Sequence, residues 1–137
     1  MSDTITGGCL CGAVRYQARG EPRFAGYCCC DDCQKQSGSG FIPFMGFSAS
    51  AIAITGDAMT HSLPLSDGRV SDRNHCARCG SLVFGGVRGR DEFHTVYAGT
   101  LDDLSQFKPK MAINTRFKPD WVILPPGLAV FEGMPGK

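Results

Sequence analysis

The sequence predicts a compact, mainly β and mostly antiparallel domain with one or two short helices. Short segments in which apolar and polar residues alternate recur along the chain, as is typical of half-buried strands. The 18 glycines and 8 prolines supply turns between such strands. The 137 residues match the usual size of one domain, so we expect a single domain over residues 1–137.

Strands are expected wherever such a run lies between turn residues. Residues 40–47 are apolar and aromatic, which is typical of a strand or of a pocket wall. Asp67-Gly68 is a hairpin signal that turns the chain toward a strand ending at Cys76. The other strands are expected at 13–18, 23–29, 51–55, 58–63, 70–75, 81–87, 93–98 and 110–115.

Helical signals are brief. Residues 31–37 predict one or two helical turns, with Asp31 as the cap at their start. A second short helix or turn is expected at 100–104, capped by Thr100 or Asp102. The large apolar residues expected in the core include Met45, Met59 and Trp121.

Charge and hydropathy exclude several classes of function. The formal net charge is +1 without a basic run, so the clustered Lys and Arg that neutralise nucleic-acid phosphates are absent. No apolar stretch approaches the length of a membrane span, and the polar N-terminus lacks a signal-peptide pattern. We therefore expect a cytoplasmic protein that binds neither nucleic acid nor membranes. Disulfides are rare in that compartment, so most of the 8 cysteines are expected to bind metal.

Two cysteine pairs have the spacing of half-sites for a structural metal. Cys9 and Cys11 lie one residue apart between glycines, and Cys76 and Cys79 form a C-x-x-C before Gly80. Neither pair saturates a zinc ion, but together they supply four thiolates for a closed tetrahedral site, which iron also accepts. The alternative is a redox dithiol at Cys76 and Cys79. Such a dithiol normally lies in a thioredoxin-like βαβ unit, whereas this pair follows a predicted hairpin.

The densest group of cysteines lies at 28–33. In the pattern C-x-C-x-x-C, Cys28, Cys30 and Cys33 can converge on one ion and leave a coordination position open, as in catalytic zinc sites. If the backbone is extended, Cys29 points to the opposite face and packs as a buried thiol. The alternative is that Cys29, a residue from elsewhere or a fixed water fills the fourth place.

An ordered series of short motifs spans most of the chain. The segments are GCLCGAVRY at 8–16, CCCDDCQKQSGS at 28–39, SDGR at 66–69 followed by Arg73, CARCGS at 76–81, AGTLDD at 98–103 and FEGMP at 131–135. A C-x-x-C alone would be weak evidence, but this ordered series is specific. It resembles the glutathione-dependent formaldehyde-activating enzyme family, also described as the CENP-V/GFA domain.

The resemblance implies a β-tent fold of the Mss4-like kind and two zinc ions per chain. It implies a carbon–sulfur lyase type of activity on a thiol–aldehyde adduct, such as the joining of glutathione and formaldehyde into S-hydroxymethylglutathione. Relatives often carry a histidine near the position of Met111, so any help from that histidine is absent here. The implied ligands are Cys9, Cys11, Cys76 and Cys79 for a structural zinc, and Cys28, Cys30 and Cys33 for a catalytic-type zinc.

An anionic, peptide-like thiol such as glutathione would need polar and basic contacts near the cysteine motifs. An arginine suits a glutathione carboxylate because its guanidinium can bind both oxygens. The candidate substrate contacts are Gln34, Lys35, Ser37, Ser39, Arg69 and Arg73.

A non-catalytic role is the alternative hypothesis. The chain would then be a zinc-stabilised module that binds a protein partner or senses metal or thiol, as proteins with Mss4-like folds do; this is an argument from fold analogy. In that case Phe41, Phe44 and Phe47 would form an exposed contact patch.

Overall fold

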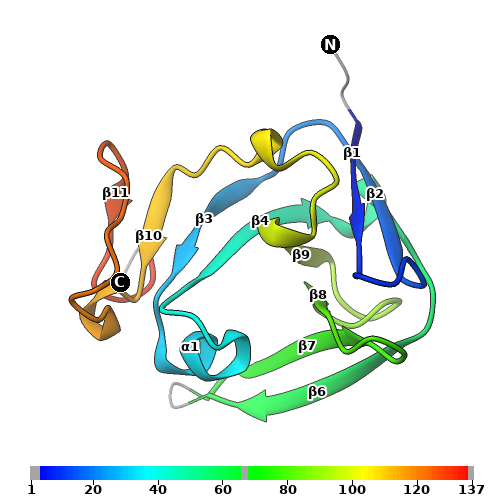
Figure 1. Ribbon diagram of the computed structural model, residues 1–137, viewed down its shortest axis with the longest axis horizontal. Coiled ribbons are helices and arrows are strands. Elements are labelled where there is room, and N and C mark those ends of the chain that lie inside the picture. The colour runs from blue at the N-terminus through cyan, green and yellow to red at the C-terminus, as the bar shows by residue number, and fades with distance from the viewer. Residues whose placement is uncertain (1–3, 66–67, 136–137) are drawn as a thin grey trace.

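The structure, a computed structural model, describes residues 4–65 and 68–135. Its strands form an eight-stranded sheet in the order β11-β10-β3-β4-β9-β8-β7-β6 and a three-stranded sheet in the order β1-β2-β5 (Figure 1). The described residues contain one α-helix, α1 (Asp31–Ser37), and several 3-10 turns. The predicted mainly β class is therefore confirmed.

The large sheet contains β3 (Phe24–Cys28), β4 (Ile42–Ser48), β6 (Ala58–Pro64), β7 (Val70–Cys76), β8 (Leu82–Gly85), β9 (Phe93–Tyr97), β10 (Met111–Ile113) and β11 (Ala129–Val130). The small sheet contains β1 (Thr4–Gly8), β2 (Arg15–Arg19) and β5 (Ile52–Thr55). Neighbouring strands pair antiparallel, except that β10 pairs parallel with both β3 and β11. This parallel pairing brings the segment after β10 beside the cysteine cluster that follows β3.

Most expected strands lie within a few residues of the observed ones. The sequence prediction missed β1, whose glycine-containing residues gave no clear signal, and β11, which has only two residues. The predicted hairpin residues Ser66 and Asp67 lie outside the described residues, but β6 and β7 on either side pair antiparallel.

The main core joins residues of both sheets. Tyr16 and Ala18 of β2 face inward, as the alternating pattern requires. They belong to the same buried cluster as Met45 and Phe47 of β4 and Val96 of β9. The expectation that Met45 is buried is therefore confirmed, since it is 0% exposed.

Two residues expected in the core are on the surface instead. Met59 is 54% exposed because it lies on β6, the edge strand of the large sheet, most of whose residues face solvent. Trp121 is 72% exposed because it lies in an irregular segment, where it packs over Gly40 without being enclosed.

The expected cap near residue 100 was also wrong. Asp103 caps the 3-10 turn Leu104–Gln106 by accepting a hydrogen bond from Ser105 N. Asp102 is instead engaged with the small sheet, since its carboxylate pairs with Arg15. The ion pair fixes the segment after Ala98–Thr100 against β2, and the capping residue is the next one, Asp103.

Candidate metal centres

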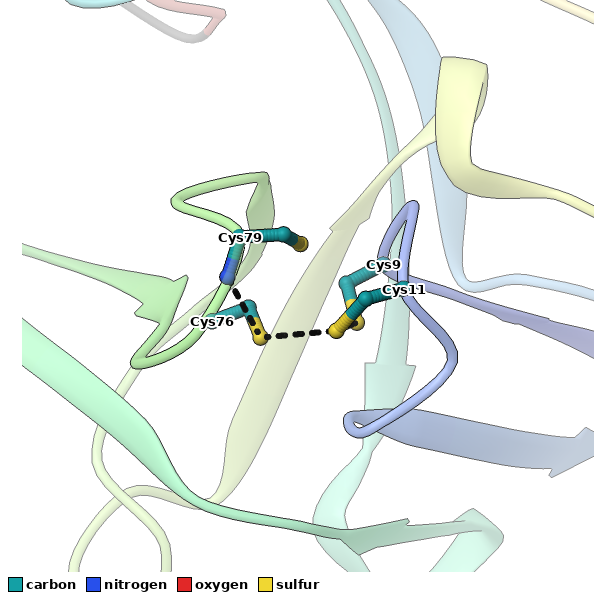
Figure 2. A group of neighbouring side chains, drawn as sticks. All are labelled: Cys9, Cys11, Cys76 and Cys79. Atoms are coloured by element: carbon teal, nitrogen blue, oxygen red, sulfur yellow. Dashed lines mark hydrogen bonds between the residues drawn. The ribbon is translucent and has the colours of Figure 1, made fainter.

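The four-cysteine centre joins two turns that lie far apart in the sequence. Cys9 and Cys11 lie between β1 and β2, whereas Cys76 ends β7 and Cys79 lies in the following turn. All four sulfur atoms lie within 4.8 Å of one another, and Cys11 Sγ is 3.7 Å from both Cys9 Sγ and Cys76 Sγ. Figure 2 shows the side chains of the two turns directed toward one another. This geometry fits one tetrahedral ion.

The turn after β7 is shaped around the Cys76 sulfur. The backbone N–H groups of Arg78 and Cys79 donate to Cys76 Sγ at 3.4 and 3.5 Å. Gly80, at φ 79, adopts the left-handed conformation that closes the turn. Hydrogen bonds from Ser81 lower the pKa of Cys79 to about 5. The C-x-x-C thus ends a strand, unlike the helix start typical of a redox dithiol.

The three-cysteine centre is built by β3 and α1. Cys28 ends β3, Cys30 immediately precedes α1, and Cys33 lies in its first turn. The three sulfur atoms lie within 4.8 Å of one another. Among the described residues, no fourth His, Cys, Asp or Glu joins this group. The separation of seven cysteines into a set of four and a set of three is therefore observed as geometry, and their roles as zinc ligands remain predictions.

Helix α1 places two of these sulfurs through its own capping. The N-cap is Cys30, whose Sγ accepts a hydrogen bond from Cys33 N at 3.2 Å. Asp31 was expected to be the cap but is the first helical residue, because the cysteine sulfur already accepts that backbone donor. The C-x-x-C spacing therefore coincides with the distance from an N-cap residue to the third helical position.

The electrostatics of the cluster favour a bound cation. Hydrogen bonds from Cys30 and Cys33 lower the pKa of Cys28 to about 2. The contacts of Cys33 with Cys28 and Cys30 raise the pKa of the Cys33 thiol far above its usual range. Three thiolates therefore coexist here when a positive ion shares their charge, and a thiophilic divalent metal such as zinc fits this donor set.

Cys29 does not belong to either centre. It is 0% exposed, and it is absent from the groups of convergent sulfur atoms. Burial raises the pKa of its thiol. The expectation that Cys29 packs as a buried thiol is confirmed.

Two side chains from other strands donate hydrogen bonds to the three-cysteine centre. Asn114 Nδ2, just after β10, donates to Cys28 Sγ at 3.4 Å. Arg73 Nη2, on β7, donates to Cys33 Sγ at 3.3 Å. Sequence analysis did not identify Asn114, since no local pattern connects it with residues far earlier in the chain.

The predicted substrate contacts occupy different environments. Gln34 Nε2 donates to Cys29 O and Phe117 O, so it ties α1 to a later segment. The Ser37 hydroxyl donates to Cys33 O at 2.7 Å within the helix, and its residue also lines a cleft. Arg73 is buried and directed at the cysteines. Lys35, Ser39 and Arg69 are exposed.

A cleft runs beside α1 and reaches the four-cysteine centre, since Cys76 and Cys79 line part of it. It consists of two hollows of about 600 and 440 Å³ that share Gln36, His75 and Gly80 as lining residues. The larger hollow reaches His61, whose ring lies 5.2 Å from that of His75. Tyr97 lines the smaller one, and burial raises the pKa of its hydroxyl. Gln36 and Tyr97 are among the polar lining residues that sequence analysis did not propose as substrate contacts.

Two further expectations concern β4 and β10. Phe44 and Phe47 are 7% and 1% exposed and only Phe41 is half-buried, so the three residues do not form the proposed exposed patch. The side chains of Phe44 and Phe47 point into the protein because β4 is a central strand. Met111 begins β10 and faces Gly26 of β3 across the parallel ladder.

The fold and its two centres define a mainly β protein equipped to hold two metal ions. The sequence profile of the glutathione-dependent formaldehyde-activating enzyme family matches residues 4–116, so the chain belongs to this family. A crystal structure of a Rhodobacter sphaeroides protein has a similar fold, with a TM-score of 0.53 and 16% sequence identity over 92% of this chain and 98% of that one. No curated protein sequence matches the chain. No helix among the described residues is long and apolar enough to cross a membrane.

Proposed function

We propose that the protein is a zinc-dependent enzyme of carbon–sulfur lyase type that acts on the adduct of glutathione, or another small thiol, with formaldehyde or another aldehyde. In the synthetic direction, the thiol sulfur bonds to the carbonyl carbon, the C=O π bond opens, and the thiol proton ends on the oxygen. Family membership supports glutathione and formaldehyde as reactants. The observation that carries the metal role is the group of three convergent sulfurs without a fourth such ligand among the described residues.

The two centres have different proposed roles. Cys9, Cys11, Cys76 and Cys79 would hold a structural zinc, since four protein ligands leave no place for substrate. Cys28, Cys30 and Cys33 would hold the second ion. When bound there, zinc supplies a Lewis acid with a free position for a thiolate or a carbonyl oxygen.

The cleft beside α1 supports a position for the thiol substrate. Gln36 and Ser37 line its wall, where Gln36 offers an amide, and α1 itself carries Cys33. Tyr97 lies on the same wall, where its phenol would donate to an oxygen of the adduct; burial raises the pKa of this hydroxyl. Lys35, Ser39 and Arg69 remain proposed contacts for the carboxylates of the substrate.

The non-catalytic alternative has lost the contact surface suggested for it. Phe44 and Phe47 of the suggested aromatic patch lie in the core. We therefore favour the enzyme.

Replacement of Cys30 by serine tests the proposed function. Serine is a strong N-cap residue, so α1 keeps its cap while the metal loses a thiolate. We expect the variant to fold but to lose its acceleration of S-hydroxymethylglutathione formation, measured by exchange NMR with glutathione and formaldehyde. Cys29→Ala is the matched control, because it removes the adjacent thiol outside the cluster, and it should stay active. Full activity in Cys30→Ser would disprove the proposed role of the centre.

A further inference from the structure

Arg73 is a buried cation that has no carboxylate partner among the described residues. The residue is 7% exposed, and its Nη1 and Nη2 donate to Asp32 O and Cys33 Sγ, each at 3.3 Å. A buried charge is costly unless an opposite charge or a set of hydrogen-bond partners compensates it. Within the described part of the chain, the ion pairs are Arg15 with Asp102, and Arg90 with Asp72 and Asp91. The groups that accept hydrogen bonds from Arg73 are instead a backbone carbonyl and a sulfur of the cysteine cluster.

Each sulfur of that cluster accepts one N–H group. Cys30 Sγ accepts from Cys33 N at 3.2 Å. Cys28 Sγ accepts from Asn114 Nδ2 at 3.4 Å, and Cys33 Sγ accepts from Arg73 Nη2 at 3.3 Å. Hydrogen bonds to metal ligands fix their orientation and draw charge away from them, which tunes the bound metal.

We propose that Arg73 is a positioning residue for a metal ion held by Cys28, Cys30 and Cys33. Three thiolates and one divalent ion carry a single net negative charge, and one guanidinium cancels it. The hydrogen bond to Cys33 also fixes that sulfur in the direction of the other two. This role replaces the predicted contact with a substrate carboxylate, because Nη1 and Nη2 of Arg73 both donate to groups inside the protein.

Asn114 positions the Cys28 sulfur as Arg73 positions that of Cys33, but its amide carries no charge. Among the described non-glycine residues, it alone has a positive φ, of 54°. Asparagine tolerates this left-handed conformation better than most residues, and such backbone is typical of functional positions. The parallel ladder pairs Ile113 with Cys28, so the residue after Ile113 is delivered directly beside the sulfur.

This inference rests on the proposed metal centre but not on the proposed reaction. The inference and the proposed reaction can therefore be tested separately, because metal affinity is measured without thiol or aldehyde. If the protein fails to join glutathione and formaldehyde but Arg73 controls metal affinity, the reaction is wrong and the inference stands.

The test compares Arg73→Met and Arg73→Lys with the control Arg88→Met. Arg88 likewise donates two hydrogen bonds, but its acceptors are the backbone carbonyls Ile54 O and Gly56 O, and it contacts no cysteine sulfur in the described structure. We expect Arg73→Met to weaken zinc binding at the three-cysteine centre by about 10- to 100-fold in a chelator competition, with the four-cysteine centre unchanged. Arg73→Lys, which keeps the charge, should recover part of the affinity. Arg88→Met should bind both ions as the wild type does.

Cobalt spectra separate a positioning role from a merely structural one. Loss of an N–H···S bond makes the sulfur a stronger electron donor, so the sulfur-to-cobalt charge-transfer band should move to lower energy in Arg73→Met. Asn114→Gly, which keeps the backbone conformation but removes the amide, should shift the band in the same direction. Unchanged affinity and an unchanged band in Arg73→Met, or equal weakening of both centres, would overturn the inference; an unchanged band in Asn114→Gly would overturn the role of Asn114.

Discussion

At the scale of single residues, Gly26 sets the distance between β3 and β10. A Cβ atom at this position would lie 2.4 Å from Met111 O and 2.7 Å from Met111 Cγ. Backbone atoms cannot move aside as a flexible side chain can, so the ladder itself would have to open. The same ladder places Asn114 beside Cys28, and the size of one residue in the core therefore affects the metal centre.

Gly26→Ala should lower both stability and metal affinity. We expect the free energy of unfolding to fall by about 1–3 kcal/mol, the usual cost of forcing extra volume into a packed site. Zinc affinity should fall at the three-cysteine centre only, since the other centre lies in different turns. Urea unfolding and chelator competition measure the two effects. Gly99→Ala is the control, because its Cβ would meet nothing within 4 Å, and a wild-type affinity in Gly26→Ala would contradict the argument.

At the scale of elements, α1 is a short helix that depends on both of its ends. Its N-terminus is capped by the Cys30 sulfur, and its C-terminus by Gly38, at φ 72, whose N–H donates to Gln34 O at 2.9 Å. Seven residues form too short a helix to be stable alone. The capping contacts therefore help to hold Cys30 and Cys33 at the spacing that a metal requires.

Gly38→Ala should weaken this helix through its backbone alone. A Cβ at Gly38 would meet nothing within 4 Å, so no clash contributes. The left-handed conformation costs an alanine about 1–2 kcal/mol, and we expect a loss of that size in the free energy of unfolding, measured by denaturant titration. Asn tolerates this conformation, so Gly38→Asn should lose less. Equal stability of the alanine and asparagine variants would show that the backbone conformation is not the cause.

The cysteine centres could largely be predicted from sequence, and their surroundings could not. The spacing of the ligands depends on local backbone structure. Cys30 and Cys33 lie at the start of a helix, and Cys76 and Cys79 lie in a turn, and neither arrangement depends on the rest of the fold. Asn114 lies 86 positions after Cys28 in the sequence, so only the tertiary fold reveals the contact. Arg73 was noticed, but its orientation depends on how β7 lies against α1. A sequence motif indicates which side chains can bind a metal. The long-range pairing of strands decides which other side chains contact those ligands.

Burial of side chains could likewise be predicted from the sequence only in part. Alternation along β2 correctly predicts which side chains face inward, since one face of a strand is covered. Residue type alone failed for Met59 and Trp121, because an edge strand and an irregular segment both leave apolar side chains in water. The aromatic run at β4 failed in the opposite sense: a central strand covered on both sides buries Phe44 and Phe47.

At the scale of the whole molecule, the four-cysteine centre connects the two sheets. One pair of ligands follows β1 of the small sheet and the other follows β7 of the large sheet (Figures 1 and 2). A metal at this point closes a loop from Cys11 to Cys76 and binds the folded chain in preference to the unfolded one. Its binding energy should therefore appear as stability of the whole fold.

Cys11→Ser isolates this contribution, because the Cys11 side chain is exposed and its replacement leaves no cavity. Structural zinc in small domains is worth on the order of 10 kcal/mol, so loss of one ligand should lower the melting temperature by well over ten degrees. A strong chelator should lower that of the wild type to a similar value and change Cys11→Ser little further. Cys30→Ser should stay close to the wild type, since its centre joins segments that β3 and α1 already hold together. Suppose that Cys11→Ser has the melting temperature of the wild type although metal analysis shows that the ion is lost. The hydrophobic core would then stabilise the fold, and the four-cysteine centre would not.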